Sequence, residues 1–380
     1  MRHMRYCIIL ASDEEGDNGQ DAARTLIRRN LSLRFRSTSL YVLLRENDEE
    51  VSVKVIVPVA GKGTRLLPQT QTKPKCLVRV AGKPILGHLI DRIRDFPMEE
   101  LILVVDADEA NEARIRQFMK HAAPAPVTYV RQTELKGPAH AIFLTREHIN
   151  GEVLIIFNDT LFDADLTAIH QTVADGIIWV KEVEDPRRFG LVVTEGDRIS
   201  TLVEKPEIPP SNLAMIGMYY LKDGPAFMKR IERVMQEGRT VKGEFYLPDP
   251  LQMMLDEGYH FEEVAVQGWY DCGTIDSLLD TNRILLDQGD RKVATTIDSV
   301  IIPPVCIEEG ANICQSVIGP YVSIAAKTTI QRSIIGDSII SEGAVVQDAL
   351  LQRCLIGEHA FVKGTYKRLN VGDYSTIQSE

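Results

Sequence analysis

A chain of 380 residues is long for one domain and suits two. Its composition, 44% hydrophobic and 26% charged, is ordinary for a globular protein, and its net charge of −11 argues against a general nucleic-acid-binding surface while leaving room for a local cationic pocket. No apolar run reaches membrane-span length, and the six cysteines contain no C-x-x-C pair, so we expect no membrane partner and free thiols in a reducing cytoplasm.

Residues 1–52 differ in character from the rest of the chain. Arginines are concentrated at 24–36 and acidic residues at 46–50. We expect a poorly ordered N-terminal extension, or a translated region ahead of a true start at Val51 or Val53. A polyanion-binding arm or a targeting segment is the alternative.

An apolar run at 55–59 predicts a buried strand, and a glycine-rich turn follows it. Gly61 and Gly63 allow the backbone to approach a ligand closely. Together with Ala60 and Thr64, they can direct successive amide N–H groups at phosphate oxygens. The turn therefore predicts a binding site for phosphate oxygens.

Two cationic side chains complete this segment. Arg65 follows the turn directly and Lys75 follows Pro74, so both can add positive charge to a site for a polyanion. The full spacing, G-x-G-T-R-x-x-P-x-T-x-x-x-P-K, is neither a Walker loop nor a Rossmann fingerprint. It resembles the signature of sugar-1-phosphate nucleotidyltransferases, of the glucose-1-phosphate thymidylyltransferase and UTP–glucose-1-phosphate uridylyltransferase type. The resemblance implies that Arg65 and Lys75 are catalytic. It also implies that the turn binds the nucleotide through Ala60, Gly61, Gly63 and Thr64.

Strand-like and helical patterns alternate from residue 53 to about 290. Strands are predicted at 101–105, 127–130, 153–157 and 177–180, and helices at 85–93, 109–120, 139–148, 166–174 and 275–287. Such alternation predicts an α/β domain at 53–290, with a Rossmann-like mixed, mostly parallel sheet covered by helices. Ligands of these sheets bind beyond the carboxyl ends of the strands, and this is where the glycine-rich turn should lie.

A glutamine and a glycine follow the predicted strand at 127–130. The amide of Gln132 can pair with a pyrimidine edge that carries N–H and C=O side by side, and the backbone of Gly137 can add another bond. The segment is similar to the base-reading segment of thymidylyl and uridylyl members of the family. His140 is assigned to helix packing at the rim, because an ionised phosphate nucleophile needs no general base. A plain loop before a helix is the alternative for Gln132.

Two aspartates are candidates for holding a cation. Asp159 ends the strand predicted at 153–157, and Asp271 precedes the helix predicted at 275–287. Mg²⁺ favours one or two carboxylates together with substrate phosphates. Alone, either residue could equally be a capping or turn aspartate. The resemblance implies that both bind the metal, although Asn158 stands where the family usually has glycine.

A further set of residues looks like the sugar-phosphate half of the site. Gly190 lies in an F-G-L-V-V segment, and Glu204 and Lys205 lie in V-E-K-P. Glu204 can accept bonds from sugar hydroxyls, while Lys205 can bind the phosphate of the sugar as a point charge. Without the resemblance, this pair would be an unremarkable surface turn.

After residue 290 the apolar residues recur every five or six positions. This period matches the hexapeptide rule of a parallel β-helix, with four or five coils at 291–380. The resemblance implies a left-handed β-helix. Its exposed faces and end coils predict assembly into a homo-oligomer.

The resemblance implies transfer of a nucleotidyl group from UTP or dTTP to a sugar-1-phosphate, most simply glucose-1-phosphate, with Mg²⁺ and in the cytoplasm. Two alternatives stay open: a non-catalytic regulatory or scaffold subunit of the same fold, and a bifunctional enzyme whose β-helix transfers an acyl group and whose sugar is N-acetylglucosamine-1-phosphate. Intact catalytic residues argue against the first. A short solenoid with a single histidine, His359, argues against the second.

Overall fold

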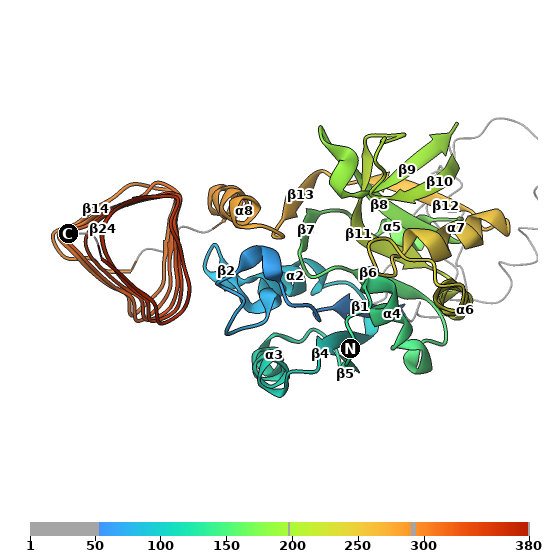
Figure 1. Ribbon diagram of the computed structural model, residues 1–380, viewed down its shortest axis with the longest axis horizontal. Helices are drawn as coiled ribbons and strands as arrows, with labels where there is room; N and C mark the ends of the chain where they lie inside the picture. The colour runs from blue at the N-terminus through green and yellow to red at the C-terminus, as the bar shows by residue number, and fades with distance from the viewer. Residues whose placement is uncertain (1–52, 197, 290–293, 379–380) are drawn as a thin grey trace, which may run out of the picture. The chain divides into compact units, whose positions relative to one another are not determined.

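The computed structural model describes residues 53–196, 198–289 and 294–378 (Figure 1). The predicted extension at 1–52 lies outside the described residues. Within the described part of the chain, no helix is long and apolar enough to cross a membrane. Among the described residues no disulfide joins the cysteines, which are Cys76, Cys272, Cys306, Cys314 and Cys354.

A nine-stranded mixed sheet forms the centre of the part of the chain before residue 290, as predicted. This region is called the first part below, and the residues from 294 on are called the second part. Its strands lie in the order β10 (Arg198–Glu204), β9 (Gly190–Glu195), β11 (Leu213–Leu221), β6 (Val153–Ile156), β1 (Val53–Pro58), β4 (Met98–Asp106) and β5 (Val127–Gln132), with β8 (Gly176–Glu182) beside β11 and β12 (Phe261–Ala265) beside β8. β10 and β11 run antiparallel to the rest. Because β1, β4, β5 and β6 are parallel, their carboxyl ends meet at one edge.

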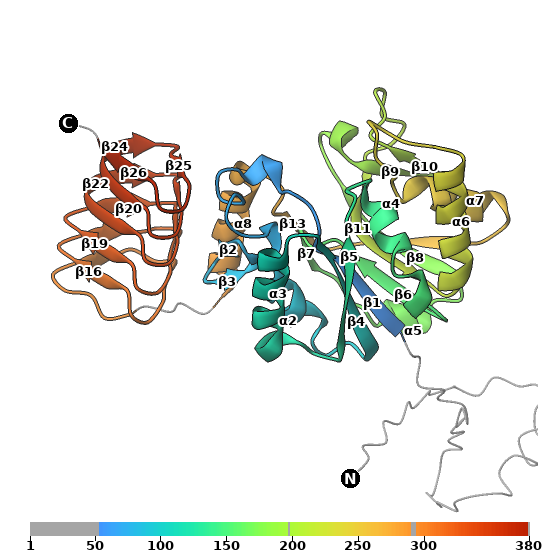
Figure 2. The same cartoon turned by 60° about the horizontal axis from the view of Figure 1, so that its bottom comes forward.

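Helices cover both faces of this sheet (Figure 2). On one face lie α2 (Ile85–Ile93), α3 (Glu109–Ala122), α5 (Ala168–Gln171) and α8 (Ile275–Gln288), and on the other lie α4 (Pro138–Phe143), α6 (Gly224–Gln236) and α7 (Pro248–Asp256). Along β1, Val55 and Val57 pack into the apolar core shared with α2 and α3, whereas Ile56 packs into the core shared with α4 and α6. Successive side chains point to opposite faces, so a strand buried on both sides must be apolar throughout.

Two predicted helices are shorter than expected. The helix predicted at 139–148 ends at Phe143, and a 3-10 turn follows at Arg146–His148. Between them, the Thr145 hydroxyl donates to the Ile142 carbonyl at 2.7 Å, a local bond that competes with helix continuation. The helix predicted at 166–174 is reduced to α5, because the backbone becomes extended at Thr172.

Short two-stranded sheets support the edge where the parallel strands end. β7 (Thr160–Asp163) pairs with β13 (Gly268–Asp271), and β2 (Arg79–Val80) pairs with β3 (Lys83–Pro84). The remaining short elements of this part are the 3-10 turns Thr64–Leu66, Lys75–Leu77 and Pro186–Arg188. The first two of these turns hold the ends of the loop that follows β1.

The second part is a parallel β-helix, as the hexapeptide pattern predicts, and Figure 1 shows its triangular cross-section. One sheet contains β14 (Val300–Ile301), β17 (Val317–Ile318), β20 (Ile334–Gly336), β22 (Val345–Gln352), β19 (Thr329–Gln331), β16 (Asn312–Cys314), β24 (Phe361–Lys367) and β26 (Thr376–Gln378). The other contains β15 (Val305–Ile307), β18 (Val322–Ile324), β21 (Ile339–Ile340), β23 (Leu355–Ile356) and β25 (Asn370–Val371). Buried ladders such as Ile307, Ile324, Ile340, Ile356 and Val371 stack each coil on the last.

Candidate active site

The glycine-rich turn lies at the carboxyl edge of the sheet, close against β4. The backbone N–H groups of Val59 and Ala60 donate to the Val104 carbonyl at 2.8 and 2.7 Å. Gly61 and Gly63 then have φ values of 129° and 57°, in the region that favours glycine. A Cβ on Gly63 would lie 2.9 Å from Thr70 Cγ2 and 3.1 Å from Lys75 Cβ, so the turn and the following loop pack tightly together.

Lys75 and Asp159 form an ion pair at this edge. The Lys75 Nζ lies 2.7 Å from Asp159 Oδ2, and the two side chains are 11% and 29% exposed. Burial opposes ionisation of Asp159, but the positive charges of Lys75 and Arg65 outweigh it and hold the pKa of the carboxyl below its ordinary value. Asp159 is therefore an anion held against two cations.

The β7–β13 pair brings Asp271 to the same place. Thr160 pairs with Asp271, and the Cys272 N–H donates to the Asp159 carbonyl at 3.0 Å, so the two aspartates lie on neighbouring strand ends. A Cβ on Gly273 would lie 2.7 Å from Asp271 Oδ1 and 3.4 Å from a guanidinium nitrogen of Arg65. The predicted cations and carboxylates thus converge on one edge.

These residues fit a cation that shares its coordination with a substrate. No group of three or more His, Cys, Asp or Glu side chains that could hold a metal occurs among the described residues. Asp271 Oδ1 accepts from the Gly273 N–H at 2.7 Å, and Asp159 Oδ2 accepts from Lys75. Two adjacent carboxylates without a third suit an ion that takes its other ligands from phosphates and water, as Mg²⁺ does.

A cavity of about 490 Å³ opens beside these groups, within the usual size range of ligand sites. Nine of the predicted residues line it: Ala60, Gly61, Gly63, Thr64, Arg65, Lys75, Gln132, Gly137 and Asp159. Asp271 is absent from this lining, which contains Gly273 instead. A second cavity of about 430 Å³ shares Gly61, Thr64 and Gln132 with it and extends toward Asp106 and Asn111.

Gln132 is held in place by two acceptors. Its Nε2 donates to the Gly137 carbonyl at 3.2 Å and lies 3.0 Å from His140 Nδ1. Burial, helped by the charge of Lys136, lowers the pKa of His140, so its ring is neutral near pH 7 and can accept this bond. With both amide hydrogens engaged, the Gln132 side-chain oxygen remains as an acceptor. His140 thus contacts the predicted base-reading residue directly, beyond the packing role that the sequence suggested.

The predicted sugar-phosphate residues lie next to one another but do not line either cavity. Lys205 Nζ lies 2.8 Å from Glu204 Oε1 and 3.9 Å from the centre of the Tyr246 ring. Burial lowers the pKa of Lys205, but Glu204 and Tyr246 outweigh this effect and raise it, so the side chain is a cation. The Tyr246 hydroxyl donates to Glu244, which does line the larger cavity. A Cβ on Gly190 would lie 2.8 Å from Glu204 Oε2.

Several residues of the site were missed by the sequence reasoning. Lys62, Leu135 and Glu244 line the larger cavity, and Lys73 lines the smaller one. Lys62 and Lys73 lie inside the signature segment, where the pattern leaves their identity open. Glu244 lies in a segment that resembles the family, but nothing in its local spacing indicates a contact with the cavity.

Comparison with known proteins finds a matching family model and several similar proteins. A family model described as "Nucleotidyl transferase" matches residues 54–288. The chain is 34% identical over 224 residues to the UTP–glucose-1-phosphate uridylyltransferase of Haloferax volcanii, which covers 57% of this chain and 89% of that relative. It is 27% identical over 358 residues to the glucose-1-phosphate thymidylyltransferase of Streptomyces griseus. This match covers 86% of this chain and 99% of that relative. It is also 33% identical over 263 residues to the bifunctional protein GlmU of Methanococcus aeolicus. This match covers 68% of this chain and 61% of that relative.

The solved structures show the same fold. A crystal structure of UDP-glucose pyrophosphorylase complexed with UDP-glucose superposes with a TM-score of 0.54 at 24% identity. The superposition covers 63% of this chain and 100% of that one.

Proposed function

The chain belongs to the nucleotidyl transferase family, and on that premise we propose that it transfers a nucleotidyl group from UTP or dTTP to a sugar-1-phosphate, giving a nucleotide sugar and pyrophosphate. Glucose-1-phosphate is the proposed sugar, because two of the relatives are named for it. The observation that carries the proposal is the Lys75–Asp159 ion pair beside Arg65 in the larger cavity.

The proposed reaction is an in-line displacement at the α-phosphorus. An oxygen of the sugar-1-phosphate attacks, the bond to the β-phosphate oxygen breaks, and pyrophosphate leaves with that electron pair. Both substrates are polyanions, so the barrier depends on holding them together and on neutralising their charge. Lys75 would contact the α-phosphate, and Arg65 would stabilise the charge that develops on pyrophosphate.

Asp159 and Asp271 would hold a divalent metal, for which we propose Mg²⁺. When bound, this ion would neutralise phosphate oxygens that Lys75 and Arg65 do not reach. Glu204 and Lys205 would bind the sugar-1-phosphate, and the Tyr246 ring that Lys205 contacts is hydrogen-bonded to Glu244 at the larger cavity. We also propose that the enzyme works in the cytoplasm and assembles as a homo-oligomer through its β-helix.

The base would be read by Gln132 and Gly137. Uracil and thymine carry an N–H at position 3 that can donate a hydrogen bond to the Gln132 side-chain oxygen, whereas cytosine has no hydrogen there. The thymine methyl group is worth about 1–3 kcal/mol in a hydrophobic pocket, so a single site can use both nucleotides.

Release of pyrophosphate from a panel of substrates tests the proposal. UTP, dTTP, CTP, ATP and GTP are each combined with glucose-1-phosphate, N-acetylglucosamine-1-phosphate and mannose-1-phosphate, with Mg²⁺ or with EDTA. We expect turnover with UTP or dTTP and glucose-1-phosphate that EDTA abolishes. A preference for ATP or GTP would overturn the role of Gln132, and no release with any pair would overturn the proposed reaction.

A further inference from the structure

The loop that joins Arg65 to Lys75 is held by the last coils of the β-helix. Gln69, at its middle, is 1% exposed. Its Nε2 donates to the Val371 carbonyl at 2.7 Å and to Asn370 Oδ1 at 3.0 Å. In return, the Asn370 Nδ2 donates to the Leu67 carbonyl at 2.9 Å. A side-chain amide from each part thus binds the other part.

A second contact involves the end of the same loop. The Lys73 Nζ lies 2.6 Å from Glu358 Oε1 and 3.3 Å from Asp373, and the side chains of Lys73 and Asp373 are 8% and 1% exposed. Asp373 also accepts from the Thr72 hydroxyl and from the Glu358 N–H. Removing one partner of a buried charge leaves the other without compensation, so this cluster constrains the position of Lys73 strongly.

The coil also approaches the loop too closely to tolerate a side chain. A Cβ on Gly372 would lie 2.9 Å from Pro68 Cβ. On its other side, the loop is tied to the glycine-rich turn, because the Thr70 hydroxyl donates to the Gly63 carbonyl at 2.8 Å. Residues 67–73 are therefore packed between the phosphate-binding turn and the β-helix.

We propose that residues 355–373 of the β-helix are a positioning element for the active site. They hold residues 67–73, and through them the separation of Arg65 and Lys75, in the arrangement that the reaction needs. Gln69, Lys73, Asn370 and Asp373 are positioning residues, because they act through Arg65 and Lys75. The inference rests on the proposed function only for its kinetic consequence, since the contacts themselves are independent of the substrate.

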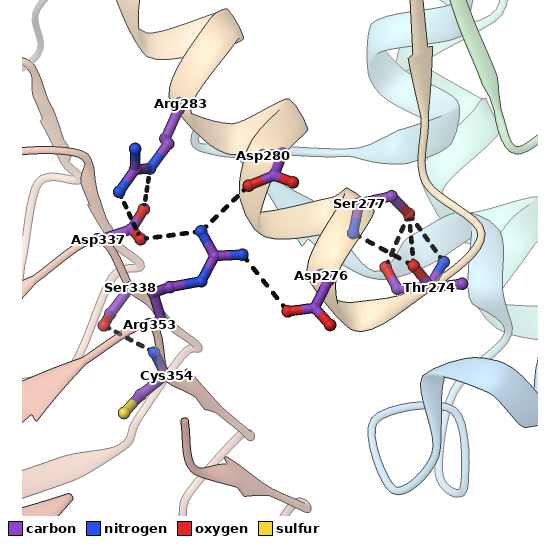
Figure 3. Close-up of polar contacts among 9 residues, drawn as sticks. All are labelled: Thr274, Asp276, Ser277, Asp280, Arg283, Asp337, Ser338, Arg353 and Cys354. Atoms are coloured by element: carbon purple, nitrogen blue, oxygen red, sulfur yellow. Dashed lines mark hydrogen bonds and ion pairs between the residues drawn. The ribbon is translucent and has the colours of Figure 1, made fainter. Parts of the chain in front are cut away.

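The β-helix offers a matched control at a different contact. Figure 3 shows Arg283 of α8 facing Asp337. Two guanidinium nitrogens of Arg283 donate to the Asp337 carboxylate, at 2.5 and 2.7 Å. Arg353 also contacts Asp337, at 3.3 Å, so the Arg283→Gln substitution leaves this buried carboxylate paired. It weakens the attachment of the β-helix to α8 without touching residues 67–73.

The test compares Gln69→Ala, Asp373→Ala and Arg283→Gln in the full chain. Amide hydrogen exchange of residues 66–75 should accelerate at least tenfold in the first two variants and stay unchanged in the third. The kcat of Gln69→Ala and of Asp373→Ala for pyrophosphate release should fall by about 10- to 100-fold. A shift of about 1 Å in the position of Arg65 or Lys75 can lower the rate by this much. The KM for the sugar-1-phosphate should stay within twofold, since its proposed site lies on other elements.

Exchange at wild-type rates in Gln69→Ala and Asp373→Ala, or equal acceleration in Arg283→Gln, would overturn the proposal. Accelerated exchange with unchanged kcat would overturn it as well. If the wild-type protein transfers no nucleotide at all, the proposed function fails, while the exchange measurement still decides whether the coil holds the loop.

Discussion

The ammonium group of Lys75 lies 2.7 Å from a carboxylate oxygen of Asp159, and this pair joins the loop after β1 to the end of β6. Each charged group affects its partner. Asp159 keeps the lysine ammonium at the edge of the cavity, and Lys75 holds the pKa of Asp159 low, so that the carboxylate stays ionised.

Lys75→Met should lower kcat/KM for pyrophosphate release by about 10²- to 10³-fold, the usual cost of one preorganised charge in an active site. Lys83→Met is the matched control, because Lys83 pairs with Asp91 on the exposed surface and lies outside both cavities. We expect wild-type rates from the control. A Lys75→Met enzyme that keeps more than a tenth of wild-type activity contradicts the role of Lys75.

Asp159→Asn and Asp271→Asn should each weaken binding of a divalent ion. Direct titration with Mn²⁺, followed by electron paramagnetic resonance in the presence of UTP, would measure this without turnover. We expect the dissociation constant to rise by more than about tenfold, since carboxylates supply the charge that holds such ions. The exposed Asp287 provides the control substitution, Asp287→Asn. Unchanged Mn²⁺ binding in either site variant would exclude that residue as a ligand.

His140→Phe should relax the choice of base. Without the acceptor on His140 Nδ1, the Gln132 amide can turn over and present its N–H groups to cytosine. The ratio of kcat/KM for UTP to that for CTP should fall at least tenfold, whereas kcat/KM for UTP itself should fall less than tenfold. The same ratio in wild type and variant would mean that His140 does not orient Gln132.

Gly63→Ala should damage the site while leaving the fold intact. The residue has a φ of 57°, and the new methyl group would meet Thr70 and Lys75 at 2.9 and 3.1 Å. The KM for UTP should rise several-fold, with circular dichroism and thermal midpoint close to wild type. Gly196→Ala is a control for the backbone effect, because Gly196 also has a positive φ and a Cβ there would contact nothing within 4 Å. Equal kinetic effects of the two substitutions would argue against tight packing at Gly63.

Acid should destabilise the protein through His88. Burial, together with the charges of Arg92 and Lys83, lowers the pKa of His88 to about 4 in the folded chain, against 6.5 for an unperturbed histidine. Between these two pH values the unfolded state binds more protons, so the free energy of unfolding falls as the pH falls. From pH 7 to pH 4.5, wild type should lose about 2 kcal/mol more than His88→Gln in urea denaturation. Parallel pH dependences for the two proteins would refute this assignment.

The signature segment was predictable because its signals are local. Glycine at 61 and 63, threonine at 64 and the spacing to Lys75 predict a phosphate-binding turn after a strand. The continuous apolar run of β1 and the repeating apolar positions of the β-helix were readable for the same reason. A strand buried on both faces is apolar throughout, and stacked coils repeat their inward side chains with a fixed period. The predicted lengths of two helices, at 139–148 and 166–174, were wrong. The Thr145 hydroxyl bond accompanies the end of the first, and extended backbone at Thr172 ends the second. Neither feature changes the apolar pattern from which the helices were predicted.

The sequence by itself therefore determined the two kinds of fold and nine of the residues that line the larger cavity. Only the tertiary structure decided that Lys75 meets Asp159, 84 positions away, and that Gln69 meets Val371, 302 positions away. Such contacts depend on which strand ends meet at one edge and on where a solenoid docks. No local pattern encodes those distances, because they follow from the packing of the whole chain.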